Sequence, residues 1–200
     1  FRDIYHFEDG KIVRVGAADR IRIPSDAEVI DISGQVIVPG FVDTHSHIGE
    51  PAGGDRSGPI QPEARALDSI NIRDAGFRRA LAGGLTTVNI MPGSGLLMSG
   101  QTIYVKLREG NDVTAIAYKN ADGNIAGGMK MANGTNSRRD PPFPGTRAKS
   151  AALVRQKFIA AQEYLAKLDA AEDDEGKKEI KAGFADGIRA DIDGNIWASA

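Results

Sequence analysis

Short apolar runs separated by turn residues fill the start of the chain. Residues 11–15, 27–32 and 35–38 each combine β-branched residues with an apolar or alternating pattern, and Gly or Pro follows each of them closely. This pattern is typical of strands that end at turns. Residues 1–40 are therefore predicted to form a small β-module.

A helical pattern between two strands follows this module. Residues 41–47 run from apolar into polar side chains, and residues 85–90 form a β-branched strand. Between them, residues 63–82 carry apolar side chains at helical spacing and end at Gly83-Gly84, a common helix terminus. The strand–helix–strand order predicts a parallel strand pair and an α/β fold.

The second half of the chain continues with short elements and one long helix. Residues 102–107 and 113–119 are predicted strands, and residues 121–124 are a predicted turn. Residues 147–169 carry the clearest helical pattern. The stripe expected to be buried consists of Val154, Phe158, Ala161, Leu165 and Leu168.

The composition excludes several classes of function. The chain has 25 basic and 27 acidic residues and a net charge of -2, so no strong field attracts nucleic acid or an anionic membrane. No apolar run approaches the ~20 residues of a membrane span. Because cysteine is absent, disulfides, thiolate metal sites and Cys nucleophiles are excluded. The location stays open, with the cytoplasm slightly favoured. A signal peptide could precede Phe1.

The segment Val36–Ile48 (VIVPGFVDTHSHI) carries the most informative chemistry. Alternate residues of a strand share a face, so His45 and His47 are expected to point to the same side and could bind one metal ion, with zinc as the default. Asp43 is expected on that side too, as a support for a histidine or as a structural carboxylate. The alternative is a pair of partly exposed histidines. Their place between an apolar strand and a Gly-rich loop favours the metal site.

Other candidates each have a plainer alternative. Glu50 could reach the same metal, although a surface carboxylate is favoured. The loop at 91–100 lacks the Gly-Lys-Ser/Thr of a P-loop, so it is interpreted as a pocket wall or a plain turn. A basic cluster could pair with a substrate carboxylate, although a solvated face is more common. It consists of Arg138, Arg139, Arg147 and Lys149.

Three longer motifs give the chain a family resemblance. They are PGFVDTHSHIGEP at 39–51, AGGLTTVNIMPGSG at 82–95 and GGMKMANGTNSRRDPPFPGTRAKSAALVR at 127–155. Together with the β-module they resemble the amidohydrolase superfamily, and most closely its imidazolonepropionase-like branch. The resemblance covers residues 8–170.

The resemblance implies a fold and a metal site. The implied fold is a (β/α)8 TIM-type barrel flanked by a β-sandwich that residues 1–40 help to build. The implied metal ligands are His45 and His47, and the metal activates a water that attacks an amide-like carbon. Some of these enzymes also bridge two metals with a carboxylated lysine. Lys130 is the candidate for that role, with a solvated lysine as the favoured alternative.

The chain also departs from the family pattern. That pattern calls for further histidines and a late Asp, whereas the chain has three histidines and none after His47. His6 lies in the β-module, outside any motif. A complete barrel needs ~250 residues. Residues 41–170 are therefore expected to be the first part of an incomplete barrel in a truncated form, with weak metal binding and no measurable hydrolysis by the isolated chain.

The end of the chain resembles a different family. Residues 183–200 (GFADGIRADIDGNIWASA) resemble a blade of gluconolactonase-like β-propellers, and this resemblance implies that Asp186 is a metal ligand. The expected organisation is a charged linker at 171–183 and a β-hairpin of foreign origin at 184–200. The alternative is a generic hairpin with an Asp-Gly-Asn turn.

The amidohydrolase resemblance implies a metal-dependent hydrolase of non-peptide C–N bonds, in an amide or cyclic amide. The expected cofactor is a divalent metal, with zinc as the default, and the expected partner is a small-molecule substrate. No catalytic residue is assigned beyond the metal ligands, and self-association into a homo-oligomer is left open. The alternatives are a catalytically inactive fragment or fusion product and a remnant of a lactonase-like propeller hydrolase.

Overall fold

The computed structural model describes residues 3–49 and 54–171. None of the described helices combines the length and apolarity that a membrane crossing requires. Four features predicted from the sequence lie outside this part of the chain and stay predictions: Glu50, nearly all of the linker at 171–183, the hairpin at 184–200 and the candidate ligand Asp186.

The chain divides into two compact units between Pro39 and Gly40. The first unit contains an antiparallel hairpin of β1 (Asp3–Glu8) and β2 (Lys11–Ala17). The strand predicted at 11–15 is confirmed as β2. The turn residue Gly10 has a φ of 73°, a conformation that glycine adopts without steric cost.

The strands predicted at 27–32 and 35–38 do not form. In the described part of the chain these residues are not in strands, and Ile30 and Val36 are 74% and 86% exposed. A strand needs a neighbour that receives its backbone hydrogen bonds, and apolar alternation alone does not supply one. The first unit therefore shows two strands of the predicted β-module.

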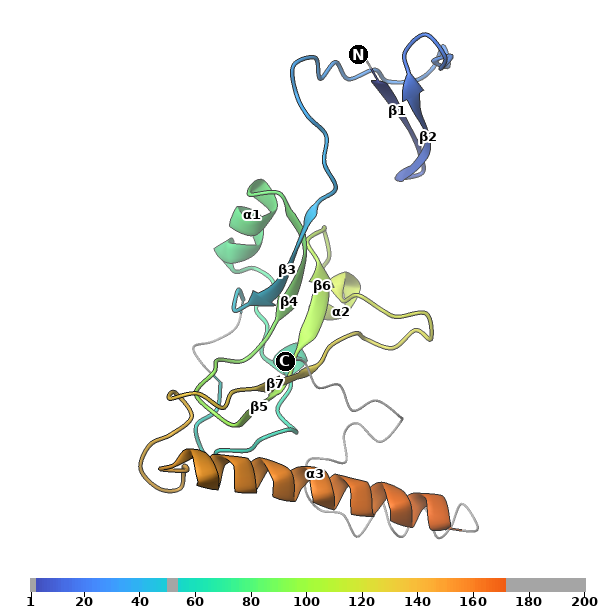
Figure 1. The fold of residues 1–200 in the computed structure, drawn as a ribbon. Helices are drawn as coiled ribbons and strands as arrows, with labels where there is room; N and C mark the ends of the chain where they lie inside the picture. The colour runs from blue at the N-terminus through green and yellow to red at the C-terminus, as the bar shows by residue number, and fades with distance from the viewer. Residues whose placement is uncertain (1–2, 50–53, 172–200) are drawn as a thin grey trace. The chain divides into compact units, whose positions relative to one another are not determined.

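The second unit is built on a three-stranded sheet with the order β3–β4–β6 (Figure 1). β3 (Phe41–Ser46) and β4 (Leu85–Ile90) are parallel and α1 (Ala75–Ala82) lies between them in the chain, which confirms the predicted strand–helix–strand unit. β6 (Ile103–Lys106) pairs antiparallel with β4, unlike a strand of a regular (β/α)8 barrel. The described residues form a mixed α/β fold, and the incomplete TIM-type barrel stays a prediction.

The helix predicted at 63–82 is shorter in the structure. A 3-10 turn, η1 (Ala66–Asp68), precedes α1, and the residues between them are not helical. There, the side chains of Asn71 and Asp74 each accept a hydrogen bond from a backbone N–H two residues further on, at 3.0 and 2.6 Å. Such local bonds compete with a helix, and the bond of Asp74 caps the start of α1.

A second, two-stranded sheet pairs β5 (Met98–Gln101) with β7 (Met129–Met131) in antiparallel orientation. The strand predicted at 113–119 is wrong in its first half, where the short helix α2 (Val113–Ile116) forms instead. The carboxylate of Asp112 accepts a hydrogen bond from the backbone N–H three residues on, at 3.0 Å. This N-cap favours a helical turn over the β-branched strand pattern.

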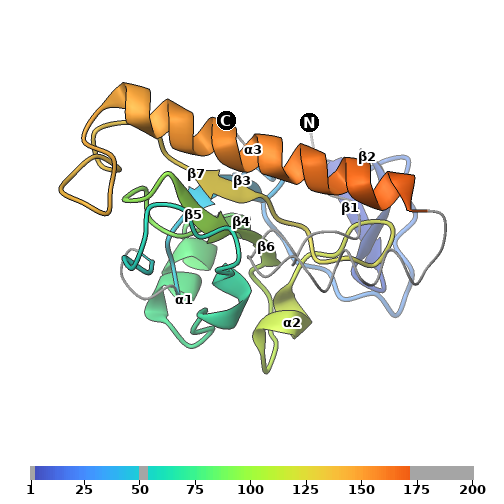
Figure 2. The same cartoon turned by 90° about the horizontal axis from the view of Figure 1, so that it is seen from below.

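The long predicted helix is confirmed as α3 (Arg147–Ala170), seen along its length in Figure 2. The predicted buried stripe is confirmed at two of its five positions, and Val154 and Phe158 are half-buried. Ala161, Tyr164 and Leu168 are buried, whereas Leu165 is 39% exposed. Spacings of three and four residues keep these buried side chains on one face.

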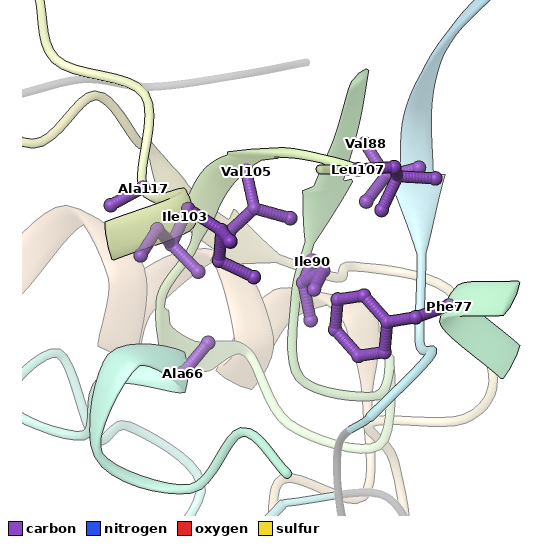
Figure 3. Packing of buried hydrophobic residues seen from close by; sticks show 9 residues of the cluster. Ala66, Phe77, Val88, Ile90, Ile103, Val105, Leu107 and Ala117 are labelled. Atoms are coloured by element: carbon purple, nitrogen blue, oxygen red, sulfur yellow. The ribbon is translucent and has the colours of Figure 1, made fainter. Parts of the chain in front are cut away.

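The core of the second unit lies on one face of the three-stranded sheet. Val88 and Ile90 of β4 pair with Val105 and Ile103 of β6, and all four are at most 1% exposed. Figure 3 shows the ring of Phe77, from α1, beside Ile90. The buried cluster consists of Ala66, Phe77, Val88, Ile90, Ile103, Val105, Leu107, Ile116 and Ala117.

Candidate metal centre

The C-terminal end of β3 contains a β-bulge. Asp43 lies beside Val88 and Ser46 beside Ile90, so three steps on β3 match two on β4. The carboxylate of Asp43 accepts a hydrogen bond from the backbone N–H of His45 at 3.0 Å. Simple alternation put Asp43 on the side of the histidines. The extra residue breaks that alternation, and Asp43 contacts the His45 backbone rather than its imidazole.

The imidazoles of His45 and His47 lie side by side. Their ring centroids are 5.2 Å apart and their planes are nearly perpendicular, at 86°. Both residues are exposed. At this separation one nitrogen of each ring can approach a single ion. We refer to His45 and His47 as the histidine pair.

A backbone carbonyl orients one member of the pair. His47 Nδ1 lies 2.7 Å from the carbonyl oxygen of Met91. A carbonyl oxygen only accepts, so His47 donates from Nδ1, and in the neutral ring Nε2 keeps its lone pair. Sequence reasoning missed this contact because a main-chain carbonyl leaves no residue-type signature. The predicted parallel pairing of β3 and β4 could have indicated the contact. In a parallel pair the two C-terminal ends lie together, so His47 after β3 comes close to Met91 after β4.

Lys130 brings a third nitrogen to the histidine pair. It lies on β7, is 8% exposed, and its Nζ is 3.2 Å from His45 Nε2, so the solvated interpretation favoured from the sequence is wrong. Desolvation lowers the pKa of Lys130. Desolvation, and then the positive charges of Lys130 and His47, lower the pKa of His45, while Asp43 opposes this shift. These lowered pKa values favour the neutral forms of the Lys130 amine and the His45 imidazole, which are the forms that bind metals.

The described residues contain no larger set of conventional ligands. Within residues 3–49 and 54–171, no group of three or more His, Cys, Asp or Glu side chains is arranged to hold a metal ion. We call the imidazoles of His45 and His47 and the amine of Lys130 the nitrogen cluster. His6 does not belong to it and lies in the other unit of the chain.

Comparisons with known proteins show which enzymes the chain is similar to. No protein-family model matches the chain. It is 36% identical to an allantoinase from Bacillus licheniformis over 85 residues and 39% identical to a dihydroorotase from Anaeromyxobacter dehalogenans over 84 residues. Each alignment covers 42% of this chain, and 15% and 16% of those proteins. The crystal structure of an amidohydrolase from Thermotoga maritima matches with a TM-score of 0.71 and 33% identity, over 88% of this chain and 49% of that one.

These similarities support an enzyme of the amidohydrolase superfamily. The chain spans about half of the Thermotoga amidohydrolase, 49%, and a much smaller share of the curated relatives. The finer assignment to the imidazolonepropionase-like branch stays a prediction, as does the gluconolactonase-like resemblance at the end of the chain.

Of the loop predicted at 91–100, residues 98–100 belong to β5, and the remaining loop is held by the segment before α3. Arg139 donates to the carbonyl oxygen of Gly95 at 2.7 Å, and its guanidinium stacks on Phe143 with 3.8 Å to the ring centroid. Arg139 therefore has a structural role. Arg147 and Lys149 are exposed, as the solvated alternative for the basic cluster predicts.

Replacing Lys130 with Met is expected to stabilise the second unit by about 1–3 kcal/mol at neutral pH, the ordinary cost of a poorly paired buried polar group. Because the folded pKa of Lys130 lies below its unfolded value, the unfolded chain binds more protons between the two values. Wild-type stability should therefore rise as the pH passes through that window, and the advantage of Lys130→Met should shrink toward the unfolded pKa of 10.5.

Urea unfolding of both proteins at neutral and alkaline pH measures this effect. Lys119→Met is the matched control, because Lys119 is exposed and its replacement should change the free energy of unfolding by less than about 0.5 kcal/mol. A Lys130→Met protein that is less stable than the wild type at neutral pH would show that the contact with His45 outweighs the cost of desolvation.

Proposed function

We propose that this chain supplies the first metal ligands of an amidohydrolase that cleaves a non-peptide C–N bond in an amide or cyclic amide. The observation that carries the proposal is the histidine pair at the end of β3, with its rings 5.2 Å apart and Lys130 beside it. In this proposal the β3–α1–β4 unit is the first part of a barrel, whose active site lies at the C-terminal ends of its strands.

The donor set fits a divalent metal of the zinc type. Imidazole nitrogens are common zinc ligands, and the bond from His47 to the Met91 carbonyl leaves Nε2 free to coordinate. The buried Lys130 would provide a third ligand, either its amine nitrogen directly or, after carboxylation, a carbamate oxygen. When bound, the metal lowers the pKa of a water molecule and so supplies a hydroxide nucleophile at neutral pH.

The residues of the chain itself orient this site. The Met91 carbonyl fixes the tautomer and direction of His47. Asp43 holds the backbone of His45 at the bulge, and desolvation lowers the pKa of that imidazole. Rigid orientation of ligands by backbone groups raises affinity because less conformational freedom is lost on binding.

The similar enzymes support a proposal for the substrate class. The allantoinase and the dihydroorotase are hydrolases that act on cyclic amides. We therefore propose a small cyclic amide as the substrate, with no nucleic acid or membrane partner, and a homo-oligomer stays open.

Cobalt substitution tests the proposal. Co²⁺ added to the chain should give the visible absorption of a nitrogen-ligated ion, and a cyclic amide such as hydantoin should shift that absorption. His47→Ala should abolish both signals. If hydantoin leaves the spectrum unchanged and the zinc-loaded protein opens no cyclic amide ring, the proposed function is wrong.

A metal-binding chain without catalysis is the alternative function. It is favoured by the finding that, among the described residues, no three conventional ligand side chains group together, because catalytic zinc sites usually have three protein ligands. A Co²⁺ spectrum that His47→Ala abolishes but that hydantoin leaves unchanged would select this alternative.

A further inference from the structure

Asn89 is a buried polar residue whose acceptor is unused. It lies on β4, is 5% exposed, and its Oδ1 is buried without a hydrogen-bond partner among the described residues. Proteins pair nearly all buried polar atoms, so an unpaired one needs an explanation. Functional sites are among the places where proteins depart from this rule.

The strand register assigns Asn89 to the face opposite the core. Val88 and Ile90, its neighbours on β4, belong to the buried cluster. Side chains alternate along a strand, so Asn89 and Thr87 share the other face. The hydrogen bond from Lys106 Nζ to Thr87 Oγ1, at 2.9 Å, lies on that second face and agrees with the assignment.

The histidine pair lies on the same face as Asn89. On β3, Asp43 lies beside Val88 and Ser46 beside Ile90, so the bulge between them faces Asn89. Ser46 is buried next to Ile90 on the core side, and the residues on either side of Ser46 are the two histidines. Neighbouring strands of a sheet lie only about 4.7–4.9 Å apart. The carboxamide is thus placed beside the imidazoles.

Neighbouring polar groups on this face are already paired. Thr87 accepts the bond from Lys106, and Lys130 lies against His45. Asn89 differs because its oxygen is buried and has no donor in the described part of the chain. An N–H group of a small molecule held at the histidine pair is a donor of the right kind and in the right place.

We propose that Asn89 is a substrate-binding residue of this site, whose Oδ1 accepts a hydrogen bond from an N–H of the cyclic amide. The inference rests on the proposed function. It names a specificity: amides that carry an N–H bind, and N-methylated amides are rejected. A site that is built to pair with an N–H group discriminates strongly, because the analogue without it leaves a buried acceptor unpaired.

The experiment compares hydantoin with its fully N-methylated analogue. Binding of both probes and of zinc is measured by calorimetry for the wild type and for Asn89→Val, which is apolar, similar in size and favoured in strands. Asn89→Asp keeps an acceptor oxygen in the same place. Thr87→Val is the matched control, since Thr87 lies on the same strand and face and already has a partner.

The expected result is a preference of about tenfold or more for hydantoin in the wild type, the effect of one hydrogen bond. Asn89→Val should lose the preference while its zinc affinity and Tm stay at or above the wild-type values. Asn89→Asp and Thr87→Val should keep the preference, and Thr87→Val should have a lower Tm.

Two outcomes would overturn the inference. The first is a preference that is missing in the wild type or kept in Asn89→Val. The second is an Asn89→Val protein in which the Tm and the zinc affinity fall together, as they would for a purely structural residue. The proposed function fails separately, when zinc affinity does not depend on the histidine pair. A preference for hydantoin that Asn89→Val abolishes would then still support the role of Asn89.

Discussion

Replacing His45 or His47 with Ala is expected to lower the zinc affinity of the chain at least about a hundredfold. Changes to groups that merely orient a metal ligand already cost about 10- to 100-fold, and removal of a ligand costs more. The wild-type affinity should itself be modest, because two imidazoles and one lysine nitrogen replace the usual three conventional ligands. Titration of the chain with zinc in a calorimeter measures both values.

His6→Ala is the matched control for this experiment. His6 lies in the first unit, where its Nε2 is 3.4 Å from the carboxylate of Glu8, and it belongs to no nitrogen cluster. Its removal should leave zinc affinity unchanged. If His6→Ala weakens zinc binding as much as His47→Ala does, the metal binds nonspecifically to histidines and the centre at β3 is wrong.

Local sequence patterns were sufficient where an element depends on its own residues. The strand at 85–90 follows Gly83-Gly84 and consists largely of β-branched residues, and the structure has it at the predicted positions. The helix from Arg147 was equally clear, since its pattern runs for more than five turns. The close approach of the imidazoles of His45 and His47 agrees with their period-2 spacing, even though a bulge lies beside them.

Local sequence patterns gave wrong predictions where the secondary structure or burial of a residue depends on a partner distant in sequence. They also failed where one side chain caps a helix. Residues 27–38 have strand-like alternation but no pairing strand among the described residues. At 113–116 the carboxylate of Asp112 favours a helical turn. Lys130 looked solvated because no local feature reveals that β7 pairs with β5 and carries it to His45. The Met91 carbonyl and the unpaired Asn89 oxygen are also invisible to residue-type motifs.

The largest stability effect is expected for Ile90→Ala, which should lower the free energy of unfolding of the second unit by about 2–5 kcal/mol. Ile90 is fully buried between Ile103 of β6 and the Phe77 ring of α1 (Figure 3). Its truncation leaves a cavity in the only parallel strand pair of the described residues, where the surrounding strands are held by their ladders and collapse poorly.

Urea unfolding with an unchanged m-value measures this loss, and two further variants calibrate it. Ile90→Val removes one methyl group and should cost only about 0.5–1.5 kcal/mol. Ile159→Ala, on the exposed side of α3 at 46% exposure, should change stability by less than about 0.5 kcal/mol. Because Ile90 lies between Asn89 and Met91, the cavity should also loosen the end of β4 and weaken zinc binding. A loss below about 1 kcal/mol for Ile90→Ala would mean that α1 does not pack on β4 in solution, and the support for the histidine pair would have to come from elsewhere.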